Sequence, residues 1–265
     1  MSALLSLLLK LKRFLIFYYG ATSINRIHSP FVYEFLQDTV KNRTPFYAFN
    51  PLSEYRKLIS LNEHDLEVLD LGAGSLSQAG DKRKVSRILR TSVKSQKYAE
   101  LLFRIVQKVN PENIIELGTS LGLTSIYLAK ACPRAQVITV EGSPAIANFA
   151  ISGFKRFRCE NVRQIIGNFD EVLPDLLKEI NVVDFAFIDG NHREEASVEY
   201  ANKIIDKCRQ NSVLVMDDIH WSDGMERAWQ RIKSNPKVSL SIDLFELGIL
   251  FFAKRHQKEH FNILY

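Results

Sequence analysis

Acidic residues stand at the ends of two apolar stretches in the second half of the chain. Asp189 follows VDFAFI, and the pair Asp217 and Asp218 follows SVLVM. If both stretches are parallel strands, their carboxyl ends share one edge of a sheet, and the three carboxylates face one crevice. Unpaired carboxylates repel one another and take up protons, whereas a hard divalent ion such as Mg²⁺ accepts oxygen ligands of this kind. The pattern predicts a divalent-metal site at these residues, with capping of the following helix as the alternative role of Asp217.

Two glycine-containing stretches are typical of nucleotide-binding loops. They read VLDLGAGS at 68–75 and IIELGTS at 114–120. A site for an adenosyl group needs a helix after the glycine turn, and then an acidic residue at the end of the next strand about 20 residues further on. After Glu116 the chain supplies QVITVEG, whose Glu141 lies 25 residues downstream. The second stretch is therefore predicted as the binding site.

The first glycine stretch is not followed by a predicted strand that ends in an acidic residue. After Asp70 the chain enters the basic run DKRKVSRILR, which offers neither a strand nor a suitably placed acid. We expect a structural or substrate-side loop before a helix. Arg83, Lys84 and Arg87 could then bind an anionic acceptor, or they form a solvated basic face.

The elements that position these residues follow from apolar periodicity after residue 96. Helices are expected near 97–109, 122–132, 144–156, 170–180, 194–208 and 223–234. Buried strands are expected at 113–118, 136–142, 162–168, 183–190 and 212–219, and two closing strands within 239–253. The closing pair, with its turn at 246–248, is expected to form an antiparallel hairpin at one edge. The alternation predicts an α/β, Rossmann-like, doubly wound sheet of seven strands, mostly parallel.

Residues 1–90 are predicted to form an N-terminal helical extension packed against a domain that spans 91–265. The first 20 residues are apolar, but Lys10, Lys12 and Arg13 interrupt them, so the run is too short for a membrane span. Two interpretations stay open. The segment is either a helix docked on its own protein or on a second copy in a homodimer, or an interfacial helix in peripheral membrane contact.

Composition describes a soluble globular protein, with 46% hydrophobic and 25% charged residues. Three scattered cysteines without a CxxC pair predict neither a disulfide framework nor a zinc cluster, and favour a cytoplasmic protein. Positive charge is concentrated at the front, where Lys and Arg outnumber Asp and Glu by 17 to 9 over residues 1–110.

Five stretches then carry a family resemblance. In chain order they read IIELGTSLGLTSIYLA, VITVEGSPAIANFA, NVRQIIGNFDEVLP, VDFAFIDGNHRE and SVLVMDDIHW. Their order and spacing resemble the class I S-adenosylmethionine-dependent methyltransferases, closest to the catechol-type O-methyltransferase branch, over residues 91–254. The resemblance implies S-adenosylmethionine as cofactor, a small-molecule acceptor methylated on oxygen, and a seventh strand inserted antiparallel.

The resemblance also assigns cofactor-binding residues. The loop around the amino-acid portion of the cofactor would be shaped by Glu116, Gly118, Thr119, Ser120 and Gly122. Glu141 would bind both ribose hydroxyls. The adenosine and its adenine ring would be bordered by Gly142, Ser143, Asn168 and Phe169, with Asp189 also on the cofactor side.

For the chemistry, the matching acidic positions in that branch read Asp, then Asp-Asn, and hold a metal that binds the substrate oxygens. Here Asp218 replaces the asparagine. His192 lies three residues after Asp189, the spacing of the branch's catalytic lysine, and is predicted as general base. Its alternative is a surface histidine on the first turn of a helix. His220 and Trp221 would line the acceptor pocket or serve only in packing.

Two other functions compete. The basic front suggests an RNA or tRNA methyltransferase, but no aromatic stacking platform accompanies the charge, which argues against nucleic acid. A non-catalytic membrane-binding or partner-binding module would explain the apolar first segment. Glu141 and the three grouped carboxylates argue against it, because a scaffold has no use for them.

Overall fold

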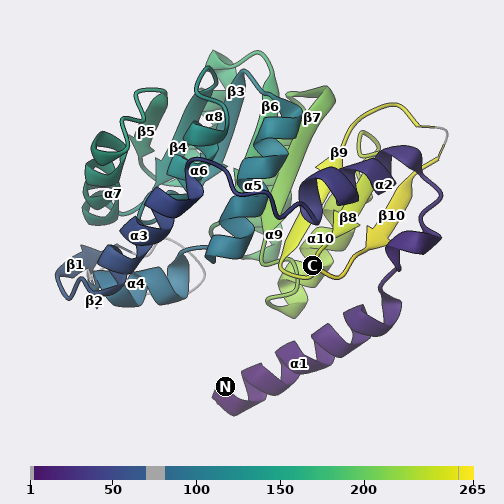
Figure 1. Cartoon of the computed structure of the whole chain (residues 1–265), viewed down its shortest axis with the longest axis horizontal. Coiled ribbons are helices and arrows are strands. Elements are labelled where there is room, and N and C mark those ends of the chain that lie inside the picture. The colour runs from purple at the N-terminus through teal and green to yellow at the C-terminus, as the bar shows by residue number, and fades with distance from the viewer. Residues whose placement is uncertain (1–2, 70–80, 256) are drawn as a thin grey trace.

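The computed structural model describes residues 3–69, 81–255 and 257–265, with side chains from residue 8 onward. A sheet of eight strands forms its centre, in the order β10-β8-β9-β7-β6-β3-β4-β5 (Figure 1). The strands are β3 (Asn113–Leu117), β4 (Gln136–Glu141), β5 (Val162–Ile166), β6 (Val183–Ile188), β7 (Cys208–Asp217), β8 (Leu240–Asp243), β9 (Leu247–Phe251) and β10 (Glu259–Asn262). Only β9 runs antiparallel to its neighbours in this sheet. The mostly parallel, Rossmann-like fold is thus confirmed.

Helices cover both faces of the sheet. They are α5 (Gln96–Val109), α6 (Leu123–Ala131), α7 (Pro144–Arg156), α8 (Phe169–Glu179), α9 (Glu194–Ile205) and α10 (Asp223–Lys233). Because successive strand side chains point to opposite faces, Phe185 and Phe187 of β6 join the core under α5, α6 and α7. Ala186 and Ile188 join the core under α8, α9 and α10. Both faces of β6 are therefore buried, which explains its continuous apolar sequence.

The expected antiparallel pair of closing strands is confirmed as β8 and β9, but this pair does not form the edge of the sheet. β8 and β9 are antiparallel, but their connection lies at 244–246, and β9 inserts between β8 and β7. An eighth strand, β10, pairs parallel to β8 and forms the edge. Its sequence EHFN is short and lacks apolar alternation, so sequence periodicity did not reveal it.

Short elements make up the N-terminal part. They are α1 (Ala3–Gly20), a 3₁₀ turn at Ile24–Arg26, α2 (Pro30–Phe35), a π-turn at Leu36–Val40, α3 (Phe49–Ser60), β1 (Asp65–Val68), β2 (Asp81–Lys84) and α4 (Val85–Ser92). β1 and β2 form a separate antiparallel hairpin. The expectation of no strand in the basic run was therefore wrong, because DKRK is β2, but this strand ends at Lys84 and not at an acid. Figure 1 shows α3 and α4 on the side of the sheet near α7, and α1 near the opposite end.

Helix α1 docks on its own chain. Arg13 pairs with Asp223 of α10 at 2.5 Å, and the rings of Phe14 and Phe17 pack on Phe245. Its outer face keeps exposed apolar side chains, including Ile16 at 65% exposure. Among the described helices, none combines the length and apolar character needed to cross a bilayer. Homodimer formation and membrane contact through this face stay predictions.

The first glycine stretch begins at the end of β1, outside the eight-stranded sheet. Residues 70–75, which carry its glycines, lie outside the described residues. The backbone amide of Leu69 donates to the Ser143 hydroxyl at 3.2 Å. Leu69, the last described residue before the gap, therefore lies at the start of α7.

His220 joins three elements beyond the end of β7. Its Nδ1 lies 2.8 Å from the Glu226 carboxylate, its Nε2 lies 2.9 Å from Asp243, and its ring stacks on Phe245. Burial by itself would lower the pKa of His220, but the Asp243 and Glu226 carboxylates raise it. The sequence had allowed His220 to line a pocket, whereas the structure gives it two carboxylate partners in the scaffold.

This arrangement predicts a pH-dependent stability. The raised pKa of His220 stabilises the fold fully below the ordinary histidine value near 6.5, and the contribution disappears as pH rises through the folded-state value. His220→Ala should cost about 1.5–3 kcal/mol in unfolding free energy at pH 6 and clearly less at pH 8.5. Denaturant unfolding of both proteins at both pH values measures this. His64→Ala, at an exposed histidine, is the control, and an equal cost at both pH values would contradict the role.

Candidate active site

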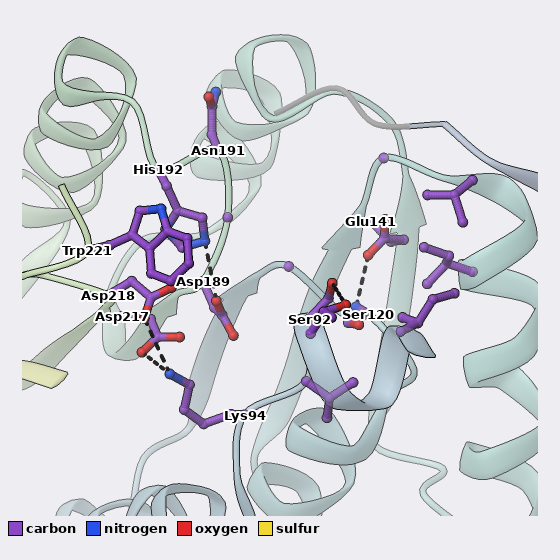
Figure 2. A pocket seen from close by; sticks show the side chains of 18 of the residues that line it. Ser92, Lys94, Ser120, Glu141, Asp189, Asn191, His192, Asp217, Asp218 and Trp221 are labelled. Atoms are coloured by element: carbon purple, nitrogen blue, oxygen red, sulfur yellow. Dashed lines mark hydrogen bonds and ion pairs between the residues drawn. The ribbon is translucent and has the colours of Figure 1, made fainter. Parts of the chain in front are cut away.

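A cavity of about 670 Å³ opens beyond the carboxyl ends of β3, β4, β6 and β7. Ten of the predicted site residues line it: Gly118, Ser120, Glu141, Gly142, Asn168, Phe169, Asp189, His192, Asp217 and Asp218. In Figure 2, Ser120 and Glu141 lie on one side, and the aspartates Asp189, Asp217 and Asp218 lie on the other, which is called the acidic side below. The volume suits a ligand of cofactor size.

The second glycine stretch forms the turn between β3 and α6. Gly118 has a φ of +106°, and a Cβ there would lie 1.9 Å from the carbonyl oxygen of Asp189. Only glycine fits this position, because a side chain would collide with the backbone that follows β6. The turn and the β6 loop are therefore packed backbone against backbone.

Glu141, at the end of β4, holds two neighbouring loops together. One of its carboxylate oxygens accepts from the Ser120 amide at 2.9 Å and the other from the Ser143 amide at 3.0 Å. The first loop shapes the cavity floor, and the second starts α7. The carboxylate is thus fixed at the cavity wall, where ribose hydroxyls could reach it.

Glu116 lies behind this loop and is fully buried. Ser125 and Thr139 donate to its Oε2. Burial raises the pKa of Glu116 to about 7, although these two hydrogen bonds oppose the shift. Its Oε1 and the Ser120 hydroxyl are buried without a hydrogen-bond partner in the described residues. Ser120 lines the cavity, so its orphaned hydroxyl fits the polar amino-acid end of S-adenosylmethionine, whereas Glu116 does not line it.

The other cofactor positions divide between contact and support. Asn168 lines the cavity, but its side chain also caps α8 by accepting from the Asp170 amide at 3.1 Å. Phe169 lines the cavity and packs edge-on against Tyr200. Four predicted residues lie outside the lining and support the turn or the start of α7: Glu116, Thr119, Gly122 and Ser143.

On the acidic side, Lys94 is the residue that sequence reasoning missed. Its Nζ lies 2.5 Å from Asp217, 3.8 Å from Asp218 and 3.8 Å from Glu246. The Lys94 side chain is only 9% exposed. The stretch SVKSQK carries no motif that marks it. The counter-charge that the carboxylates require is thus supplied by the chain itself.

Burial and the neighbouring charges shift the pKa values of the groups in this cluster. Burial raises the pKa of Asp189 to about 6, against the opposing charge of Lys94. Burial and the neighbouring Asp189 raise the pKa of Asp217 as well. Burial by itself would lower the pKa of Lys94, but the surrounding carboxylates raise it above its ordinary value, so the amine is an ammonium.

The predicted metal ligands do not fit a divalent ion in this arrangement. Two unit charges about 4 Å apart repel by about 4 kcal/mol at an effective dielectric constant of about 20, and a divalent ion beside the ammonium doubles that. Within the described ranges, no group of three or more His, Cys, Asp or Glu side chains is arranged as a metal site. Asp217 does not cap the following helix either, since Ser222 caps α10.

His192 lies in the loop between β6 and α9, which begins at Glu194, and not on a helical turn. Its Nε2 is 3.8 Å from the Asp189 carboxylate, and its φ of 40° is left-handed. His192 and Trp221 both line the cavity, on the acidic side in Figure 2. Of the basic residues after the first glycine stretch, Arg83 lines the cavity, whereas Lys84 and Arg87 are not among the described lining residues.

This sheet, with a glycine turn after β3 and an acid ending β4, defines the class I methyltransferase fold. Residues 115–219 match a family model described as a methyltransferase domain. The chain is therefore similar to S-adenosylmethionine-dependent methyltransferases, and the curated relatives that it matches include O-methyltransferases named for catechol.

Individual relatives bear this out. Catechol O-methyltransferase of Niastella koreensis is 28% identical over 156 residues, which cover 58% of this chain and 66% of that protein. The chain thus spans less than two thirds of that curated relative's length.

Two solved structures share the fold. The O-methyltransferase from Bacillus cereus with S-adenosylhomocysteine has a TM-score of 0.54, 19% identity, and coverage of 84% of this chain and 97% of its own. TomG from Streptomyces achromogenes with S-adenosylmethionine has a TM-score of 0.56, 17% identity, and coverage of 83% and 95%.

Proposed function

We propose that the protein methylates a hydroxyl oxygen of a small molecule with S-adenosylmethionine as donor. The observation that carries the proposal is that one cavity joins the Glu141-anchored glycine turn to His192 and the acidic strand ends. Cofactor and acceptor could thus lie side by side. The substrate named for the catechol relative supports an aromatic hydroxyl as the acceptor group.

The chain's residues have separate roles in this reaction. When bound, the cofactor supplies a methyl group on a positively charged sulfur. Glu141 would hold the ribose of that cofactor, and the glycine turn would hold its amino-acid end. His192 takes the proton from the acceptor's hydroxyl group. The oxygen of the acceptor then forms a bond to the methyl carbon, and the bond between that carbon and the cofactor's sulfur breaks. The Asp189 carboxylate lies 3.8 Å from the Nε2 of His192, on the same side of the cavity.

A methyl-transfer assay tests the proposal. The protein is incubated with tritium-labelled S-adenosylmethionine and, separately, with phenols, catechols or bulk tRNA. We expect label in a low-molecular-weight hydroxyl compound. Label found only in tRNA would establish the RNA alternative. Failure of S-adenosylhomocysteine to bind in calorimetry would refute the enzyme role and favour a non-catalytic module.

The assignment of His192 makes its own prediction. His192→Asn, which retains a residue type that tolerates left-handed backbone, should lower kcat by about 10²–10⁴-fold and leave cofactor affinity unchanged. Rates and calorimetric dissociation constants are compared with those of His28→Asn, at an exposed histidine outside the cavity lining. A kcat within about twofold of wild type would remove His192 from the mechanism.

A further inference from the structure

Lys94 reaches the acidic cluster from a part of the chain distant in sequence. It lies on the short connection between α4 and α5, whereas its partners end β7 and occupy the turn between β8 and β9. Figure 2 shows its side chain directed at Asp217 and Asp218, in direct contact with them. Its ammonium thus stands among the same carboxylates that sequence reasoning gave to a metal.

The lysine is held firmly in this place. The helix that precedes Lys94, α4, is anchored by its buried side chains Val85, Ile88 and Leu89. Tyr98, one turn into α5, lies with its ring 5.7 Å from Nζ. With 9% of the side chain exposed, withdrawal of the ammonium would leave Asp217, itself 2% exposed, as an unpaired buried carboxylate. Lys94 and Asp217 therefore stay paired, because separation would leave a buried charge without a partner.

We propose that Lys94 is the resident cation of this site and takes the place of a divalent metal, so that the protein does not require one. The inference rests on the proposed function, because it concerns the acceptor side of the same cavity. Asp217, Asp218 and Glu246 surround the ammonium, and a cation that competed for these oxygens would have to displace it.

This replacement changes what the acceptor must offer. A metal ion gains from chelation by two neighbouring oxygens, whereas an ammonium donates separate hydrogen bonds to single acceptor atoms. Lys94 lines the cavity, so its ammonium can donate to an acceptor oxygen there. As the acceptor's proton moves to His192, the positive charge of Lys94 stabilises the negative charge on that oxygen. An acceptor with one ionisable hydroxyl group therefore suffices, without a vicinal pair.

Manganese binding tests the inference directly. Wild-type protein saturated with S-adenosylhomocysteine is titrated with Mn²⁺, and free ion is measured by electron paramagnetic resonance. We expect no stoichiometric binding to wild type. Lys94→Met should expose the carboxylates and bind Mn²⁺ at least 10-fold more tightly. Lys94→Arg, which restores the charge, should return to the wild-type result.

The matched control is Lys97→Met, three residues further on, whose lysine faces Tyr98 and Tyr265 and does not line the cavity. It should behave as wild type. Stoichiometric Mn²⁺ binding by wild type would overturn the inference, as would a folded Lys94→Met that gains no Mn²⁺ affinity. If Lys94→Met does not fold, the wild-type titration decides alone.

The proposed function is tested separately in the same samples. Calorimetry with S-adenosylhomocysteine precedes each manganese titration, so loss of cofactor binding is recorded independently of metal binding. Methyl transfer by wild type should also be unchanged within twofold by EDTA. A tenfold loss that Mg²⁺ restores would overturn the inference while leaving the methyltransferase assignment intact.

Discussion

Glu141→Ala should weaken S-adenosylhomocysteine binding by about 100-fold or more. Hydrogen bonds to a charged group contribute about 1.5–3 kcal/mol each, and Glu141 is expected to accept two from the ribose. The variant also releases the amides of Ser120 and Ser143, so the cavity wall loses its anchor. Isothermal titration calorimetry measures the change in dissociation constant.

Asp175→Ala is the control for this experiment, because Asp175 is an exposed acid of α8, with its side chain 76% accessible. It should bind like wild type. Asp70→Ala tests the first glycine stretch in parallel. Binding that is lost in Asp70→Ala but retained in Glu141→Ala would move the cofactor site to the first stretch.

Gly118→Ala should destabilise the protein by about 2–5 kcal/mol and abolish measurable cofactor binding. The added Cβ would lie 1.9 Å from the Asp189 carbonyl oxygen, at a φ of +106° that side chains rarely adopt. Left-handed backbone costs about 1–2 kcal/mol for a residue with a Cβ, and overpacking adds about 1–3 kcal/mol. Denaturant unfolding and calorimetry measure both effects.

The matched substitution is Gly224→Ala in α10. A Cβ at Gly224 would meet nothing closer than 3.6 Å, and alanine favours a helix by up to about 1 kcal/mol. Its stability should equal or exceed that of wild type. If Gly118→Ala were as stable as Gly224→Ala and bound cofactor normally, the close approach of the glycine turn to the β6 loop would be refuted.

The sequence predicted much of this site because its residues end strands. Glu141, Asp189 and Asp217 each close an apolar stretch, and parallel strands bring such ends to one edge. The choice of the second glycine stretch followed from the same logic, since β4 supplies the required acid. Local pattern and sheet topology together determine these positions.

Other features depend on contacts that no local pattern records. Lys94 meets Asp217 across 123 positions of sequence, and a lone lysine between two helices looks like any solvated charge. The sequence therefore could not reveal that a lysine supplies a counter-charge to the grouped carboxylates. Likewise β10 is formed by pairing with β8, and its four residues have little strand character of their own.

The edge strand β10 also joins the two ends of the chain. The amide of Thr22, just after α1, donates to the carbonyl of Asn262 at 2.7 Å. Arg104 of α5 donates to the Tyr265 hydroxyl at 3.1 Å, and that hydroxyl donates to the Lys97 carbonyl at 3.1 Å. Opening of β10 therefore breaks the backbone contact at Thr22, while α1 keeps its own contacts with α10 and Phe245. The amide hydrogen of Thr22 should exchange with solvent when β10 separates from the sheet, so its exchange rate reports on that edge.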